Sequence, residues 1–205
     1  MTKAETIITM IRYGEALKKI DRSGWVLAGV NSKRIESVAE HSYGSVLSSI
    51  VIAQQLKSID IEINIGKVAL MAALHDLPES ITGDIARTKE FLEDINRVKA
   101  KDLAEMNAIT EIIEPMGETF QSLFHVWKEF NLGESIEARV VKGADIIDML
   151  IHARSLEESG ISPKSLDQFF ETSRSLIKLV DIEIVTEIYN KLCNEHNAIT
   201  RTQSG

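Results

Sequence analysis

IGKVALMAALHDLPE, residues 65–79, combines an apolar helical pattern with ionisable side chains at its end. Its apolar residues recur at the spacing of one helical face, and Asn64 directly before them is a good helix cap. Pro78 disfavours helical backbone in the residue before it, so we expect the helix to end or bend at His75 and Asp76. Two polar side chains that finish a buried face predict a functional site rather than simple packing.

A second helix is indicated earlier in the chain, after Ser37. The segment Ser37-Val38-Ala39-Glu40 has the form of a capping box, in which the serine and glutamate side chains bond the first free backbone N–H groups of a helix. Residues at the spacing of one helical face then continue as far as Ile52. His41 therefore lies in the first turns of a predicted helix.

The rest of the chain reads as amphipathic helices separated by breaks. We expect helical segments over about residues 88–114, 120–130 and from 134 onward, and one or two closing helices between 166 and 191. Strand alternation and low-complexity sequence are absent from the sequence. The predicted fold class is all-α, as a single domain over residues 1–205 with a motif-bearing core of about 15–155 and C-terminal helices over 164–197. In the segment 88–114 the expected inward residues are Leu92, Ile95, Leu103, Met106 and Ile113.

Composition excludes several classes of protein. The 205 residues include 23 Lys and Arg against 31 Asp and Glu, and the net charge of −8 opposes binding to a nucleic-acid polymer. We expect no membrane association and a cytoplasmic location, because the apolar stretches are short and no signal-like segment opens the sequence. Cys193 is the single cysteine, so neither an internal disulfide nor a thiolate zinc cluster is possible.

An aspartate in an apolar run points to a cation. Asp145 lies within VVKGADII, residues 140–147, where a buried and unpaired carboxylate would cost several kcal/mol. Together with His41, His75 and Asp76 it can hold one divalent ion and leave coordination positions open for water and substrate. The mixed nitrogen and oxygen donors are compatible with cobalt, manganese, nickel, iron or zinc, and such a site suggests a hydrolase.

These four positions resemble the signature of the HD-domain metal-dependent phosphohydrolases: a first histidine, a later histidine–aspartate doublet and a distant aspartate. Over about residues 15–155 the chain further resembles the 5′-deoxynucleotidase branch of that superfamily. The resemblance implies a helical bundle with a metal site at the centre of converging helices, and it makes all four residues ligands of one ion. The blocks that carry it are Arg22-Ser23-Gly24-Trp25, ESVAEHS at 36–42, HDLPE at 75–79, TGDI at 82–85 and VKGAD at 141–145.

The resemblance also suggests catalytic side chains. Glu79 stands three residues after Asp76 and is our first choice for orienting or deprotonating the attacking water. Asp84, after Gly83, is expected beside the substrate as a second catalytic carboxylate or as a partner of the site. The alternative is that Glu79 is a solvated residue at a helix start and Asp84 a helix cap.

Three further residues are expected to bind substrate. Arg22 offers a planar fork of donors for phosphate, and Lys142, one helical turn before Asp145, offers a compact positive charge. Trp25 is either a wall against the sugar that leaves no room for a 2′-hydroxyl or a plain core tryptophan. We expect structural roles for the remaining large polar and aromatic side chains of interest, His125, Trp127, His152 and His196, the last in a polar tail.

The predicted function is that of a metal-dependent phosphomonoesterase, which hydrolyses (deoxy)ribonucleoside 5′-monophosphates to nucleoside and phosphate and prefers deoxyribonucleotides. One alternative is an HD phosphohydrolase for another ester, such as an alarmone, a cyclic nucleotide or a nucleoside triphosphate. Another is a non-catalytic helical scaffold stabilised by its metal. Besides the small-molecule nucleotide, we expect a second copy of the chain as partner, in a homodimer or higher homo-oligomer, because residues 88–130 carry more apolar stripes than a small single layer requires.

Overall fold

The structure is a computed structural model, and it describes residues 2–30 and 34–203. Within these residues every regular element is a helix, and the one extended pairing is an isolated bridge between Asp21 and Ser37. The predicted all-α fold is confirmed. The helices are α1 (Lys3–Leu17), α2 (Ser23–Leu27), α3 (Val38–Ser58), α4 (Ile65–Leu74), α5 (Glu79–Thr82), α6 (Lys89–Glu93), α7 (Ile95–Ile113), α8 (Gln121–Leu132), α9 (Ile136–Glu158), α10 (Pro163–Val180) and α11 (Glu183–Gln203), with short 3₁₀ turns at Glu114–Met116 and Glu118–Phe120.

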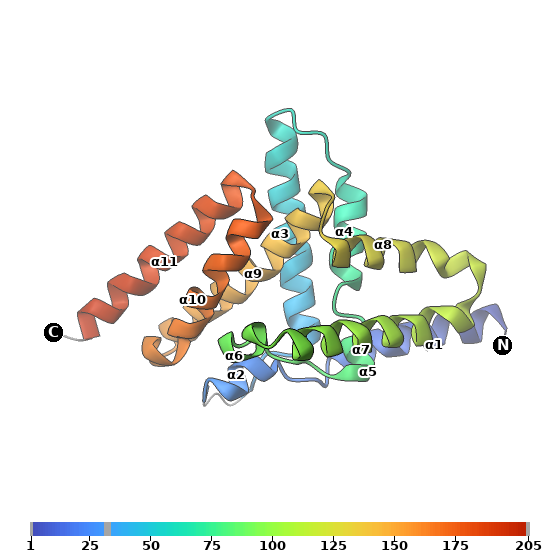
Figure 1. The fold of residues 1–205 in the computed structure, drawn as a ribbon, viewed down its shortest axis with the longest axis horizontal. Coiled ribbons are helices and arrows are strands. Elements are labelled where there is room, and N and C mark those ends of the chain that lie inside the picture. Colours follow the sequence, from blue (N-terminus) through green and yellow to red (C-terminus); the bar gives the residue numbers. More distant parts are fainter. Residues whose placement is uncertain (1, 31–33, 204–205) are drawn as a thin grey trace.

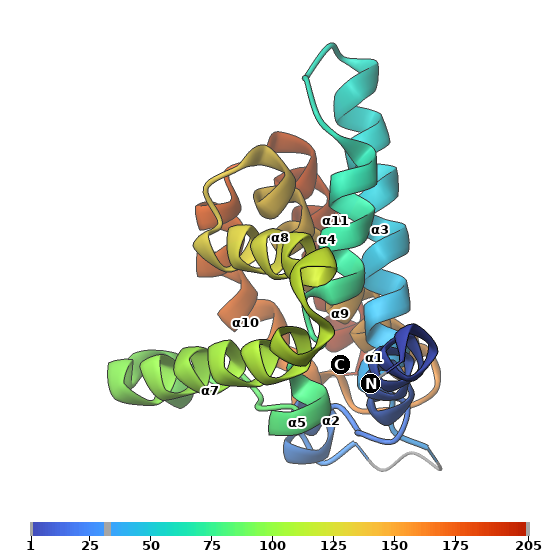
Figure 2. The same cartoon turned by 90° about the vertical axis from the view of Figure 1, so that its right-hand side faces the viewer.

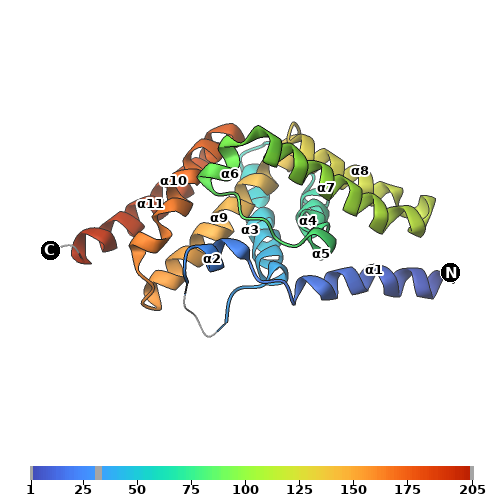
Figure 3. The ribbon, with the colours of Figure 1, turned by 60° about the horizontal axis from the view of Figure 1, so that its bottom comes forward.

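Helix α9 is the central element of the bundle (Figure 1). It packs most extensively on α3, which also lies along α4 (Figure 2). Helices α10 and α11 pack on α9 on one side of α3, whereas α1 and α8 lie on the other side (Figures 1 and 3). The main core forms where α3, α4, α9 and α10 meet, and it includes Val68, Met71, Val140, Ala144, Ile147 and Leu166.

Local hydrogen bonds set the starts of α3 and α4 as the sequence predicts. The Ser37 hydroxyl accepts a bond from the Glu40 N–H at 3.3 Å, and the Glu40 carboxylate accepts from the Ser37 N–H at 2.9 Å, which completes the capping box. The Asn64 side chain accepts from the Lys67 N–H at 3.0 Å. Helix α4 ends at Leu74, so His75 and Asp76 stand where a buried helix gives way to a turn.

The segment 88–114 differs from its prediction. It forms two helices rather than one, because the backbone of Asp94 is extended and ends α6, and the Asp94 carboxylate accepts bonds from the Asn96 and Arg97 N–H groups at the start of α7. Ile95 and Leu103, expected to point inward, are 60% and 62% exposed. The face of α7 that is buried begins instead with two charged residues that contact each other, and it comprises Lys101, Glu105, Ala108, Ile109, Ile112 and Ile113.

The C-terminal residues form two long helices, α10 and α11, and the second contradicts one expectation. His196 is not in a polar tail: it is buried in α11 and its ring stacks on Phe170 at 4.1 Å between centroids. Its two ring nitrogens contact Glu157 of α9 and Asp167 of α10. These polar contacts explain how a histidine in a charged stretch is buried. Among the described helices, none combines the length and the apolar character that crossing a bilayer requires.

Candidate metal centre

The two histidines are held through Nδ1, so that both present Nε2 to the same space. His41 on α3 is completely buried, and its Nδ1–H donates to the Asp148 carboxylate at 2.8 Å. His75 lies at the end of α4, and its Nδ1–H donates to the Ala72 carbonyl at 2.7 Å. A neutral imidazole that carries its proton on Nδ1 has its lone pair on Nε2. Both rings are therefore oriented as metal-binding imidazoles are, with the second nitrogen fixed by an acceptor.

Two carboxylates meet these nitrogens. Asp145 Oδ1 lies 2.9 Å from His41 Nε2, and Asp76 Oδ2 lies 3.1 Å from His75 Nε2 and 3.8 Å from His41 Nε2. His41, His75 and Asp145 each offer a donor atom within 4.8 Å of the others. The Asp145 side chain is 29% exposed, so the carboxylate faces a cavity although its neighbours in the run are buried.

A divalent cation fits this donor set. His75 Nε2 and Asp76 Oδ2 are buried and lie 3.1 Å apart as an ion pair, yet neither atom makes a hydrogen bond of good geometry with any described residue. Buried polar atoms without partners are costly and rare, and a shared ion would satisfy both. The structure brings the four predicted ligands together from α3, α9 and the end of α4, as expected for converging helices. These residues are His41, His75, Asp76 and Asp145.

The electrostatics of the centre favour a positive charge. Burial and the Arg22 guanidinium act to lower the pKa of His41, but the Asp145 and Asp148 carboxylates outweigh them and raise it to about 10. Burial likewise acts to raise the pKa of Asp145, yet contact with His41 lowers it to about 2. The pKa of Asp76 is lowered as well, because the His75 charge outweighs the effect of burial. Without a metal, a proton on His41 supplies the positive charge that these carboxylates attract.

Asp148 is a member of the centre that sequence reasoning missed. It stands one helical turn after Asp145 on α9, and this spacing is the signal that could have identified it. A Cβ atom on Gly44 of α3 would lie 2.0 Å from Asp148 Oδ1, so only glycine allows the carboxylate to reach His41. The close approach of α3 and α9 at Gly44 therefore serves the orientation of His41.

Glu79 lies next to the centre at the start of α5 and is only 4% exposed. This burial contradicts the alternative of a solvated helix-start residue. Its Oε1 is 3.7 Å from the Lys101 ammonium, and its Oε2 has no hydrogen-bond partner in the described part of the chain. Burial, followed by the charges of Asp76 and Asp84, raises the pKa of Glu79 well above its usual value, against the opposing charges of Lys101 and Arg22. A carboxyl with a raised pKa is suited to exchanging a proton near neutral pH.

Asp84 links the loop after α5 to the start of α2. Its carboxylate accepts bonds from the Ser23 N–H and, at 2.8 Å, from the Ser23 hydroxyl, and it lies 3.5 Å from the Arg22 guanidinium. Gly83 before it has a φ of +73°, a backbone conformation that favours glycine. Asp84 thus caps α2 and holds Arg22 at the edge of the cavity.

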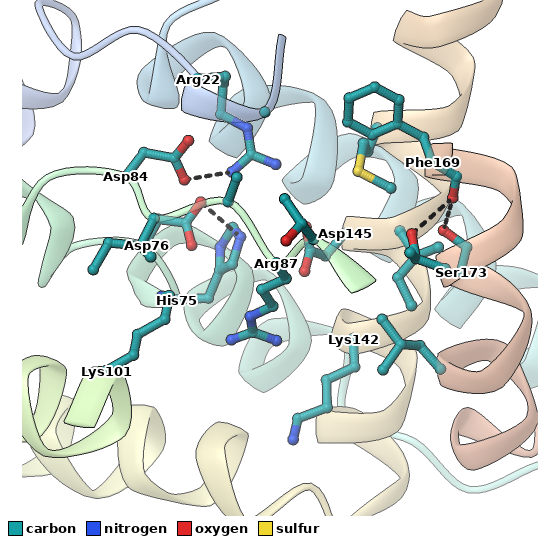
Figure 4. Close-up of a pocket in the computed structure, with 18 of the residues that line it drawn as sticks. Arg22, His75, Asp76, Asp84, Arg87, Lys101, Lys142, Asp145, Phe169 and Ser173 are labelled. Atoms are coloured by element: carbon teal, nitrogen blue, oxygen red, sulfur yellow. Dashed lines mark hydrogen bonds and ion pairs between the residues drawn. The ribbon is translucent and has the colours of Figure 1, made fainter. Parts of the chain in front are cut away.

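The predicted site residues share one cavity of about 400 Å³ (Figure 4). His41 lies behind its surface, whereas eight of the nine predicted residues line it. Figure 4 shows the side chains of His75, Asp76 and Asp145 around one space, with Arg22 and Asp84 beside it. The eight lining residues are Arg22, Trp25, His75, Asp76, Glu79, Asp84, Lys142 and Asp145.

Comparison with known proteins supports the grouping of these residues. The sequence profile of the HD domain family matches residues 14–181. The chain belongs to the HD domain family. It is 31% identical to the 5′-deoxynucleotidase HDDC2 of Danio rerio over 167 residues, which cover 81% of this chain and 77% of the relative. The human protein of the same name is 27% identical over 187 residues, with 90% and 85% covered.

A solved structure shares the fold of this chain. The conserved hypothetical protein from Pyrococcus furiosus superposes with a TM-score of 0.75 and is 29% identical, covering 91% of this chain and 99% of its own. The predicted superfamily is confirmed by the profile, and the predicted branch by the similarity to proteins named 5′-deoxynucleotidases.

Trp25 of this HD-domain protein is both a core residue and part of the cavity wall. It is 2% exposed, its indole N–H donates to Glu36 at 2.8 Å, and its ring packs on Phe169 of α10 at 4.4 Å between centroids. The His152 ring also packs on Trp25, with the ring centroids 5.2 Å apart. The block that carries the resemblance is therefore anchored on a C-terminal helix for which the sequence offers no motif.

Lys142 lies on the same cavity but has partners of its own. Its ammonium donates to the Asn131 carbonyl at 3.1 Å and stands 5.5 Å above the Phe130 ring. Burial, and then the charge of Arg87, lowers its pKa. Figure 4 shows the Lys142 side chain directed away from the Asp145 carboxylate, so the two side chains do not contact each other.

The remaining predicted structural residues lie outside the donor set. Trp127 is 1% exposed and donates to the His75 carbonyl at 3.2 Å, which helps to fix the turn after α4. His125 is exposed on α8. Sequence reasoning missed several cavity residues, among them two cations and the apolar wall from α10, namely Arg87, Lys101, Phe169 and Leu176.

Proposed function

We propose that this HD-domain protein is a metal-dependent phosphomonoesterase that hydrolyses nucleoside 5′-monophosphates to nucleoside and phosphate. The observation that carries the proposal is the convergence of two Nε2 atoms and two carboxylates at a cavity that also holds Arg22 and Glu79. His41, His75, Asp76 and Asp145 would hold one divalent ion, such as cobalt, manganese, nickel, iron or zinc. When bound, such an ion polarises a phosphoryl oxygen and lowers the pKa of water.

The shape and chemistry of the cavity suit a nucleotide. Its volume of about 400 Å³ lies within the range of about 300–1,000 Å³ that is usual for small-molecule sites. One end carries the charged groups of the metal centre, and α10 supplies apolar side chains such as Phe169 and Leu176 at the wall. Arg22, held by Asp84, offers a fork of donors for the phosphate, and a base and sugar can contact the apolar wall.

The side chains of the chain can carry the proton transfers of the reaction. Hydrolysis forms a bond between a water oxygen and phosphorus, breaks the bond between phosphorus and the 5′-oxygen, and needs a proton on the leaving oxygen. Glu79 orients the attacking water, takes up its proton and, once protonated, supplies a proton to the leaving 5′-oxygen; its raised pKa suits this exchange. Asp84 positions Arg22 against the phosphate and stands as the second carboxylate of the site.

The test is phosphate release from a panel of ribo- and deoxyribonucleoside 5′-monophosphates with each candidate metal. We expect activity with at least one metal and higher kcat/KM on deoxyribonucleotides, because Trp25 lines the cavity and a sugar bound against it would have no room for a 2′-hydroxyl. Equal rates on ribo- and deoxyribonucleotides would contradict the preference for deoxyribonucleotides but would still support the phosphomonoesterase activity. Absence of phosphate release from every monophosphate with every metal would contradict the function itself.

The alternative functions are separate outcomes of the same assay. Faster hydrolysis of an alarmone, a cyclic nucleotide or a nucleoside triphosphate would identify another phosphohydrolase. A metal-stabilised scaffold would bind the ion and release nothing. Replacing Glu79 by alanine is expected to lower kcat by about 10²–10⁴-fold in the esterase and to change nothing in a scaffold.

We further propose that the protein forms a homodimer or higher homo-oligomer. Exposed apolar side chains on α1 and α7 support this, among them Ile11 at 65%, Ile95 at 60% and Leu103 at 62% exposure. Light scattering is expected to give a mass above the 22.9 kDa of one chain, and a mass of one chain contradicts it. The cytoplasmic location stays a prediction.

A further inference from the structure

A buried lysine faces the candidate site from a helix without a recognised motif. Lys101 lies on α7, and its side chain is 6% exposed. Its ammonium contacts Glu105 one turn further along the same helix and lies 3.7 Å from Glu79 Oε1 on α5. Figure 4 shows the Lys101 side chain extending from α7 toward His75 and Asp76. Lys99, two residues earlier on α7, is exposed, in contrast to the buried Lys101.

Stability alone does not account for this arrangement. Taking an ammonium and a carboxylate out of water is costly, and a well-packed apolar pair is often as stable. A lysine has three N–H donors, of which Glu105 occupies one direction. The ammonium also forms an ion pair with Glu79 at 3.7 Å from Oε1, and Glu79 Oε2 has no hydrogen-bond partner in the described residues. The buried Lys101–Glu105 pair therefore contacts Glu79, the side chain that must be well oriented if it is to handle the water proton.

Lys101 is poorly placed to act as a phosphate ligand. Its ammonium lies between the Glu105 and Glu79 carboxylates, so its positive charge is already compensated at close range. Arg22 has a planar fork of donors at the other edge of the cavity and suits that task. Lys101 lines the cavity, but the contacts of its ammonium are with two protein carboxylates.

We propose that Lys101, held by Glu105, is a positioning residue that fixes the Glu79 carboxylate relative to the metal centre. The inference rests on the proposed esterase function and deepens it. Helix α7 packs on the short α5, so Lys101 holds a four-residue helix whose own hydrogen bonds do not orient the Glu79 side chain. Loss of this contact would leave substrate binding intact and displace the group that handles the water proton.

The first test compares Lys101→Met with Lys99→Met, an exposed lysine on the same helix. We expect Lys101→Met to lower kcat by about 10–100-fold, the cost of misplacing a catalytic group, while KM and inhibition by inorganic phosphate change by less than about twofold. Lys101→Arg should restore most of the lost turnover. Lys99→Met should match the wild type.

A double-mutant cycle with Glu79→Gln separates positioning from other roles. Because Lys101 acts through Glu79, Lys101→Met should cause no further loss of kcat in the Glu79→Gln background. A lysine that bound phosphate or acted independently would give additive losses. Metal content and thermal unfolding of each variant show that the centre and the fold are intact.

The outcomes distinguish this inference from the function on which it rests. A wild type that releases no phosphate overturns the function and this role of Lys101 together. An active wild type with an unchanged Lys101→Met kcat, a loss carried by KM, or additive losses in the cycle each overturn the inference alone. If Lys101→Met does not fold, Glu105→Gln releases the ammonium from its partner and should give the same kcat loss and the same cycle.

Discussion

At the scale of single residues, the centre is built by fixing the far nitrogen of each histidine. Asp148 holds His41 and the Ala72 carbonyl holds His75, so that both Nε2 atoms face the Asp76 and Asp145 carboxylates. Such outer partners set ring orientation and raise ligand basicity in metal sites. The four candidate ligand positions could be predicted because their residue types and order resemble a known signature. Asp148 could have been predicted only from its place one turn after Asp145.

The raised pKa of His41 predicts how the metal-free protein responds to pH. The folded-state pKa of about 10 exceeds the ordinary value of 6.5, so folding favours the protonated ring. This stabilisation is complete below about pH 6.5 and is lost as the pH rises toward 10, at about 1.4 kcal/mol per pKa unit of difference. Urea unfolding of metal-free protein should therefore show falling stability over this range.

Two comparisons isolate the contribution of His41. The metal-loaded protein should lack this loss, because its imidazoles are already deprotonated. The variant His41→Gln should lack it as well, since glutamine does not titrate. A metal-free wild type whose stability follows that of His41→Gln across the range would contradict the predicted protonation.

At the scale of elements, helix starts were predictable and helix faces were less so. Ser37 and Asn64 cap α3 and α4 through bonds between residues close in sequence, which a local pattern contains. The buried face of α7 was predicted only in part: Ile113 is buried, but the face carries the Lys101–Glu105 pair instead of the apolar Ile95 and Leu103. Charged residues are rarely buried unless paired, and pairing in space is not visible in a hydrophobic pattern.

Gly44 allows α3 and α9 to approach, and its replacement tests that contact. Glycine within a helix usually costs about 0.5–1 kcal/mol relative to alanine, so propensity alone predicts that Gly44→Ala stabilises. The new Cβ would lie 2.0 Å from Asp148 Oδ1, and we expect a loss of about 1–3 kcal/mol together with weaker metal binding.

Gly14→Ala provides the matched control for this substitution. Gly14 lies in α1, and a Cβ there meets no other atom within 4 Å. This variant should gain stability and keep its metal affinity. Urea unfolding and metal titration of both variants are the measurements. A Gly44→Ala variant that is more stable and keeps its metal affinity would show that metal binding does not require the observed position of the Asp148 carboxylate.

At the scale of the whole molecule, helices from distant parts of the sequence build one cavity. The candidate metal centre draws on α3, the end of α4 and α9, whereas α10 forms the apolar wall against which Trp25 packs. The all-α class could be predicted from periodicity, and the HD domain family from its motifs. The role of α10 could not, because an amphipathic stripe does not show which surface it covers.

The outermost helix should affect stability more than catalysis. His196 on α11 contacts Glu157 and Asp167, and among the described residues of α11 none lines the cavity. His196→Ala leaves the buried Glu157 without this partner, and we expect a loss of about 1–3 kcal/mol in unfolding free energy. Turnover measured well below the melting temperature should stay near that of the wild type. A large kcat loss in a folded variant would show that α11 reaches the site.

The most direct test of the metal centre is anomalous X-ray diffraction from crystals of the protein loaded with cobalt or manganese. The account predicts one ion for each chain at the cavity, about 2.0–2.2 Å from donor atoms of His41, His75, Asp76 and Asp145. An ion held by other side chains, or one that leaves Asp145 more than about 3 Å away, would contradict it.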